Sequence, residues 1–122
     1  MLKIHDGSKK YDLEDRTFSF AKEVRAFVKT LPQTVANKED IKQLIRASGS
    51  VGANYIEANE SLSKKDFVMG IKISRKEVKE SRYWLYLLDT GLNESLHKAR
   101  GSLIQEATEL MNIFGSIVRR SE

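Results

Sequence analysis

Cysteine is absent from this chain of 122 residues. Its absence excludes disulfide bonds, thiolate metal sites and a thiol nucleophile together, and it suits the reducing cytoplasm. No apolar run approaches the ~20 residues that a membrane-spanning helix requires. The first ten residues, MLKIHDGSKK, lack the apolar segment of a secretion signal. We therefore expect a cytoplasmic protein that has no membrane partner.

Residues that carry catalytic chemistry are also scarce. The only histidines are His5, in the N-terminal segment, and His97, near an expected helix start, whereas di-metal centres in helix bundles use two Glu-x-x-His pairs. A serine nucleophile would have only His97 as its base. Walker A and Gly-x-Gly-x-x-Gly phosphate loops are absent, and Gly49 and Gly52 fall inside an expected helix. We expect neither an enzyme nor a bound metal or cofactor.

The remaining composition is typical of a single globular domain. Hydrophobic residues make up 40% and charged residues 31% of the chain, which leaves enough apolar surface for one core. The net charge is +4, with a sequence pI of about 9.3, a moderate bias that is compatible with a polyanionic partner. We expect a flexible lead-in over residues 1–11 and one domain over residues 12–122.

Two helices are expected before residue 61. Asp12 can cap the first, whose apolar residues recur at helical spacing. The chain's only proline, Pro32, ends this helix because the residue before a proline avoids the helical conformation. Asn37 is the candidate cap of the second helix, which we expect to extend to about Glu60.

Two further helices complete the expected fold. Ser63 begins a variant of the capping box, so the third helix should run from there to Thr90 and stop at Gly91. The last helix should begin near Asn93 or Ser95, and no strand alternation longer than four residues appears. Four amphipathic helices joined by short loops predict an all-α protein, an antiparallel up-down-up-down four-helix bundle.

The segment of residues 46–60 holds an unusual number of small residues for a helix. Each glycine inside a helix costs about 1 kcal/mol relative to alanine, a cost that the close approach of another helix offsets. Polar side chains fall on one line of this segment, at spacings that let neighbours touch: Arg46, Ser50, Asn54 and Glu57. We interpret this polar row as a solvated or structural network that joins helices or subunits, with a ligand-binding row as the alternative.

The third expected helix carries a second apolar stripe beside its core-facing one. This second stripe consists of Met69, Ile73, Trp84 and Leu87. A helix with two apolar stripes is either central in its own domain or buried against another copy of the chain, and a four-helix domain has no central helix. The stripe therefore predicts an interface between copies of the chain.

The opposite side of the same helix is basic. Five cations and two tyrosines share it: Lys72, Arg75, Lys76, Lys79, Arg82, Tyr83 and Tyr86. Cations that neutralise phosphates, with aromatic rings on which bases stack, are typical of nucleic-acid binding proteins. The alternative is a solvated face of a lysine-rich helix, since a run of charges often means only that.

The sequence around several of these residues resembles that of a known family. The resemblance rests on Arg46, Ser50, Val51, Asn54, Tyr55, Ile56 and Glu57, and continues through Phe67, Ile71 and the block of residues 79–85. The pattern resembles the 23S ribosomal RNA intervening-sequence proteins, also known as the S23 ribosomal protein family. Val51 stands where isoleucine is usual, and Ala58 and Asn59 stand where the family often has a glycine, so the turn after the second helix departs from the pattern.

The resemblance implies a four-helix bundle that assembles as a ring, commonly a pentamer, with no established enzymatic activity. The family is in turn similar to accessory variability determinant proteins, which are basic pentamers that bind nucleic acid and a reverse transcriptase. We therefore expect a homo-oligomer that binds RNA or DNA through the basic side of its third helix, with a protein as a further partner. The alternative is a scaffolding ring that binds proteins and has no affinity for nucleic acid.

Overall fold

A computed structural model describes residues 12–122, which form four α-helices and no strand. The helices are α1 (Leu13–Val28), α2 (Val35–Asn59), α3 (Lys64–Leu87) and α4 (Glu94–Ser121). The all-α class expected from the sequence is thereby confirmed. The predicted lead-in over residues 1–11 lies outside the described residues.

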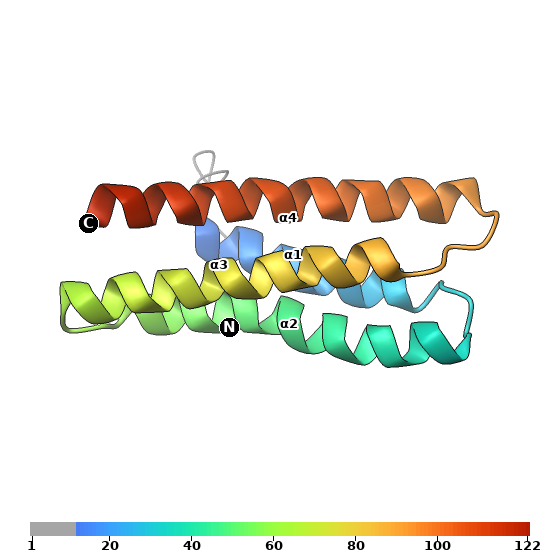
Figure 1. The fold of residues 1–122 in the computed structure, drawn as a ribbon, viewed down its shortest axis with the longest axis horizontal. Coiled ribbons are helices and arrows are strands. Elements are labelled where there is room, and N and C mark those ends of the chain that lie inside the picture. Colours follow the sequence, from blue (N-terminus) through green and yellow to red (C-terminus); the bar gives the residue numbers. More distant parts are fainter. Residues whose placement is uncertain (1–11) are drawn as a thin grey trace.

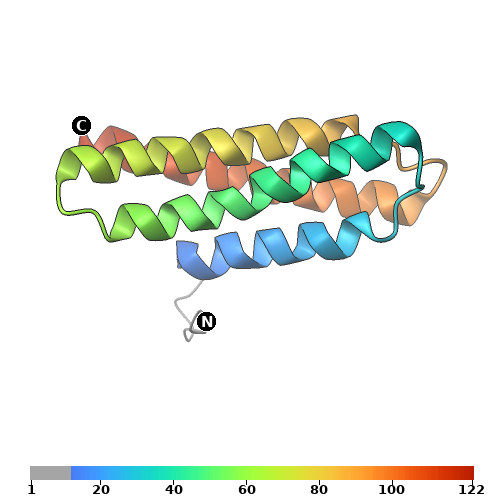
Figure 2. The same cartoon turned by 90° about the horizontal axis from the view of Figure 1, so that it is seen from below.

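The four helices lie side by side around one core (Figures 1 and 2). Each helix packs against the next, and α1 also contacts α4. The loops after α1 and α3 lie at one end of the molecule, and the loop after α2 lies at the other. Every helix contributes to the core, with Phe20, Leu44, Ile71 and Phe114 among its largest fully buried side chains.

Three helices begin where local capping signals predict. The Asp12 carboxylate accepts hydrogen bonds from the backbone of Glu14 and Asp15 at the start of α1. The Ser63 hydroxyl accepts one from Asp66 N at 3.1 Å, and the Asn93 side chain accepts one from Leu96 N at 3.0 Å. Each cap satisfies a backbone N–H that the first helical turn leaves without a partner.

The predicted cap of the second helix at Asn37 is wrong. Thr34 is the cap, and its hydroxyl accepts the backbone N–H of Asn37 at 3.0 Å. The Asn37 side chain is buried and serves another purpose, because its amide donates to the carbonyl oxygens of Pro32 and Asp89 and accepts from Asp89 N, each at 2.9 Å. It joins the first loop to the third, since Asp89 lies 52 residues after Asn37 in the chain.

The predicted end of the third helix at Thr90 is also wrong. The helix ends at Leu87, and Leu88 is extended. Two side chains hold the released backbone, since Asn37 bonds both backbone groups of Asp89 and an Arg100 guanidinium from α4 donates to the Leu88 carbonyl. Gly91 does take the left-handed conformation, with φ of 65°, but within the loop.

Small residues let α2 approach both neighbours closely, as the sequence predicts. A β-carbon added at Gly52 would lie 2.8 Å from the Thr17 hydroxyl of α1, and one added at Gly70 of α3 would lie 2.7 Å from Ala58 Cβ of α2. Buried hydroxyls at these contacts bond to backbone carbonyls: Thr17 to Leu13 at 2.7 Å and Ser74 across to Val51 at 3.0 Å. The core therefore accommodates these polar side chains without unsatisfied donors.

Charges hold α1 to α4. The Arg16 guanidinium donates to both carboxylate oxygens of Glu106, at 2.7 and 3.0 Å, and to Glu109 at 3.1 Å. Hydrogen bonds from the Gln105 amide and from Arg16 hold the pKa of Glu109 below its usual value.

Within the described residues, no helix is long and apolar enough to cross a membrane.

The close contact between α2 and α3 predicts opposite effects for two glycine substitutions. Gly70→Ala places a methyl group against Ala58 and should lower the free energy of unfolding by about 1–3 kcal/mol, as overpacking does. Gly101→Ala, in α4 with nothing within 4 Å of the new methyl group, should raise it by about 0.5–1 kcal/mol. Urea denaturation followed by circular dichroism measures both, and equal stability of the two variants would contradict the close contact.

Candidate nucleic-acid interface

The seven residues predicted to bind nucleic acid lie on α3. The two arginines contact α4, whereas Lys76, Lys79 and Tyr83 also line a groove that borders α2. The three lysines among them are exposed, whereas the two arginines are partly buried at the seam between the helices. Arg75 Nε donates to the Met111 carbonyl at 3.3 Å, and Arg82 Nη1 donates to the Thr108 hydroxyl at 3.2 Å. The arginines are thus anchored on α4, while the lysine side chains extend into solvent.

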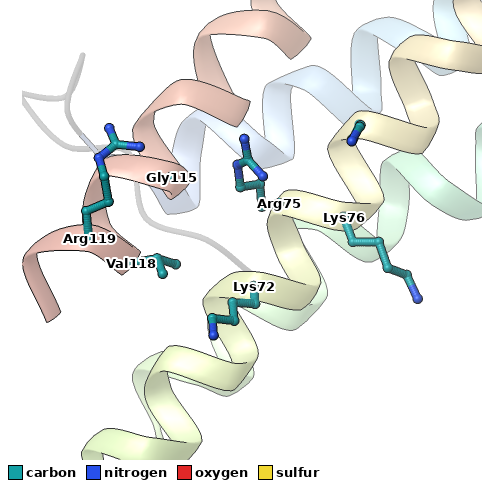
Figure 3. A pocket seen from close by; sticks show the side chains of 7 residues that line it. Lys72, Arg75, Lys76, Gly115, Val118 and Arg119 are labelled. Carbon is teal, nitrogen blue, oxygen red and sulfur yellow. The ribbon is translucent and has the colours of Figure 1, made fainter. Parts of the chain in front are cut away.

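A groove of about 450 Å³ runs between α3 and α4, and we call it the α3–α4 groove (Figure 3). Its lining is formed by Lys72, Arg75, Lys76, Lys79, Gly115, Val118 and Arg119. Five of the seven lining residues are cations, and none is acidic. A concave surface lined by one sign of charge focuses its field and attracts counter-ions of the opposite sign.

Lys72, Lys76 and Lys79 follow one another along α3, and we call them the lysine ridge. A second groove, of about 500 Å³, lies on the other side of this ridge. Gln43 of α2 and five residues of α3 form it: Lys76, Lys79, Glu80, Tyr83 and Trp84. Lys76 and Lys79 therefore border both grooves. The two aromatic rings meet edge to face, with centroids 5.1 Å apart and planes at 75°.

The tyrosines predicted for stacking are accessible. Tyr83 is 58% exposed and Tyr86 is 63% exposed, and both lie on α3 beyond Lys79 toward its C-terminal end. An exposed aromatic ring beside a cationic groove is the arrangement on which unpaired bases stack. The surface of α3 therefore combines a cationic groove with exposed aromatic rings.

Acidic residues lie at the margins of this surface. Glu122 pairs with Lys72 at 3.2 Å. Glu77 and Glu80 point toward α2, where Arg46 Nη2 lies 3.5 Å from the Glu77 carboxylate and 3.3 Å from that of Glu80. The α3–α4 groove itself remains free of carboxylates among its lining residues.

The predicted polar row on α2 consists of local bonds within the helix and of one residue, Arg46, that contacts α3. The Ser50 hydroxyl donates to the Arg46 carbonyl at 3.0 Å, and the Asn54 amide donates to the Ser50 carbonyl at 2.8 Å. Arg46 pairs with Glu77 and Glu80 of α3, whereas the Glu57 side chain is exposed and has no bond within residues 12–122. The row joins helices through Arg46 alone.

The predicted apolar stripe is divided between the chain's own core and solvent. Trp84 is partly buried and packs against the core, and Ile73 is partly buried as well. Met69 and Leu87 are 54% and 49% exposed. These two side chains, near opposite ends of α3, are the most exposed part of the stripe.

Other side chains that could bind a metal or act in catalysis do not form a cluster within the described residues. Glu94 and His97 form a single Glu-x-x-His pair on α4, and both are exposed. The His97 Nδ1 atom lies 3.2 Å from Arg100 Nη2. Within the described part of the chain, no three metal-ligating side chains cluster.

Sequence reasoning missed three residues of the α3–α4 groove, which are Gly115, Val118 and Arg119. In the sequence, Gly115 is only a glycine near a helix end, and Arg119 is only a cation at the C-terminal end of the helix dipole. Their role follows from the position of α4 along α3, which places Gly115 opposite Arg75. The spacing of four between Gly115 and Arg119, one helical turn, is the only signal in the sequence that could have linked them.

Comparisons with known proteins agree on the family. The sequence model of the family described as 23S rRNA-intervening sequence protein matches residues 9–115. A similar solved structure is the crystal structure of a protein with unknown function from the S23 ribosomal protein family of Bacteroides thetaiotaomicron VPI-5482. It is 29% identical, the match covers 86% of this chain and 96% of that one, and the TM-score is 0.69. No curated protein matches the chain significantly.

The contact between Arg46 and Glu77 predicts a specific energetic coupling. The Glu77 side chain is largely buried, and its Oε1 atom has no hydrogen bond within the described residues, so the ion pair with Arg46 at 3.5 Å is its main compensation. Removing Arg46 leaves a carboxylate that is poorly solvated. In a double-mutant cycle, Arg46→Ala and Glu77→Gln should couple by about 0.5–1.5 kcal/mol in unfolding free energy.

Glu57 supplies the matched control for this cycle. It lies on the same helix line as Arg46 but is exposed, so Arg46→Ala and Glu57→Gln should be additive within about 0.5 kcal/mol. A stronger coupling to Glu57 than to Glu77 would show that the row acts along α2 rather than across to α3.

Proposed function

The chain belongs to the 23S rRNA-intervening sequence protein family, and from its α3 surface we propose that it is a non-enzymatic homo-oligomer that binds RNA or DNA. In this proposal each subunit is an antiparallel up-down-up-down bundle in the cytoplasm, and the ligand lies along α3. The observation that carries the proposal is the α3–α4 groove, in which five cations and no carboxylate line one concave surface.

The geometry supports binding through the backbone of the nucleic acid. Phosphates lie along the α3–α4 groove and over Lys76 and Lys79, and unpaired bases stack on Tyr83 and Tyr86. Lysine amines on flexible stems contact phosphates without reading base identity. We therefore expect little sequence preference and a preference for single strands, whose bases are free to stack.

Assembly multiplies this surface. Met69 and Leu87 present apolar side chains to solvent beside the lysine ridge, and burying them against another copy would remove them from water. In a ring each subunit adds one basic face, so weak contacts combine into avidity. Five subunits are the expected number from the family resemblance. A protein-binding scaffold, which also uses exposed apolar residues, is the alternative that the binding experiment separates.

Charge reversal of the ridge should weaken binding of nucleic acid. Fluorescence anisotropy with labelled single- and double-stranded DNA and RNA should show at least about tenfold weaker binding for Lys72/Lys76/Lys79→Glu than for the wild type at low salt. The matched control is Lys22/Lys38/Lys98→Glu, which makes the same change in net charge at exposed lysines outside both grooves. Equal weakening by the two triple variants, or no binding by the wild type, would leave the scaffold as the function.

Light scattering should give a mass several times the 13.9 kDa of one chain, about fivefold for a pentamer. Leu87→Glu should dissociate the assembly and leave the helical circular dichroism unchanged, because the side chain is half exposed in the single subunit. Leu92→Glu, at a fully exposed leucine of the loop after α3, is the control and should leave the mass unchanged. A monomeric wild type at micromolar concentration is the result that removes the assembly from the proposal.

A further inference from the structure

Two arginines from different helices converge on Gly115 in the α3–α4 groove. A β-carbon added at Gly115 would lie 3.2 Å from Arg75 Nε and 3.5 Å from Arg119 Nη1. Figure 3 shows Arg75 on α3 and Arg119 on α4 reaching the space beside Gly115, whereas the Lys76 amine extends away from α4. A β-carbon at this point would crowd the Arg75 guanidinium and meet that of Arg119 at ordinary contact distance, so the glycine leaves room chiefly for Arg75.

Several N–H donors of these two guanidinium groups have no acceptor within residues 12–122. Arg75 uses Nε for the Met111 carbonyl, which fixes the plane of the group, and its Nη1 and Nη2 atoms bond to no acceptor within residues 12–122. The Arg119 guanidinium likewise has no hydrogen bond or ion pair within that range. No carboxylate lines the groove, so two cations stand close together without the counter-charge that usually separates such a pair.

We propose that this place binds one phosphate group in its dianionic, monoester form, such as the 5′-terminal phosphate of a nucleic acid strand. This phosphate seat consists of Arg75, Gly115 and Arg119, with Lys72 at its edge. The inference deepens the proposed function and rests on it for the nucleic acid. A free phosphate compound offers the same chemistry, and the experiment below separates the two sources.

The charge and shape of the seat favour a terminal phosphate over an internal one. An internal phosphodiester carries one negative charge, whereas a phosphate monoester carries nearly two at neutral pH. Attraction to the same cations is therefore greater for the monoester. Guanidinium forks bind two oxygens of one phosphate at a time, and a terminal phosphate presents three oxygens that are free of ester bonds.

Glu122 is an acidic competitor at the edge of the seat. Its carboxylate pairs with Lys72 at 3.2 Å, so it holds the one lysine at the edge of the seat. Replacing Glu122 by glutamine would free this amine and should strengthen phosphate binding.

Gly115→Ala tests the seat with little risk to the fold. The added methyl group meets Arg75 Nε rather than backbone, so the guanidinium should shift away from the Met111 carbonyl while α4 stays helical. Gly101→Ala is the matched control, because it lies in the same helix and its methyl group meets nothing within 4 Å. Arg119→Gln removes one donor group directly. Thermal unfolding of each variant shows that the fold persists.

The binding measurement compares two single strands of the same sequence, one with a 5′-phosphate and one with a 5′-hydroxyl. The wild type should bind the phosphorylated strand about tenfold more tightly, the gain expected from charge-assisted hydrogen bonds to one group. Gly115→Ala and Arg119→Gln should reduce this preference to about twofold or less, while Gly101→Ala keeps it and Glu122→Gln raises it. Inorganic phosphate and a nucleoside 5′-monophosphate should compete with the phosphorylated strand.

The outcomes separate the seat from the general function. Equal binding of both strands by the wild type, or an undiminished preference in Gly115→Ala, overturns the seat and leaves the proposed function standing. If neither strand binds but calorimetry detects inorganic phosphate or the monophosphate, and Gly115→Ala abolishes this, the seat stands for a free phosphate compound and the nucleic-acid function falls. Binding of none of these ligands overturns both.

Discussion

The close approach of α2 to its two neighbours is the constraint on which the remaining structure depends. Gly52 lies against Thr17 of α1, and Ala58 lies against Gly70 of α3, at distances that leave no room for larger side chains. These contacts fix both the separation of the helices and their position along one another, because a shift by one residue would place a β-carbon in the same space. The bond from the Ser74 hydroxyl to the Val51 carbonyl fixes the same interface.

The orientation of α3 determines the functional surface. With its small and apolar side turned to α2 and the core, the basic side faces the seam with α4 and the solvent. Contact with α4 then divides the cations into two kinds. Arg75 and Arg82 are held by groups of α4 and Lys72 pairs with Glu122, whereas Lys76 and Lys79 extend into solvent and can follow a ligand. Fixed donors beside mobile ones suit a polymer whose phosphates are regularly spaced but whose path varies.

Local signals in the sequence predict much of this structure, and contacts between distant residues account for what they miss. Caps at Asp12, Ser63 and Asn93 act within one turn, so the pattern identifies them. Asparagine is a common capping residue, but the Asn37 side chain bonds to Asp89 instead. This contact and the bond from Arg100 to the Leu88 carbonyl hold the backbone where α3 ends early. Helical periodicity likewise places the cations on one side of α3, whereas the position of α4 that brings in Gly115 and Arg119 depends on packing.

The dependence of affinity on salt concentration tests the central claim, that the α3–α4 groove binds phosphates, most directly. Each phosphate contact with a single strand contributes about −0.7 to the slope of log affinity against log salt concentration. Because five cations line the groove, each engaged subunit should make four or five phosphate contacts. We therefore expect a slope of about −3 for each engaged subunit. An affinity that stays constant between low and physiological salt would contradict the account.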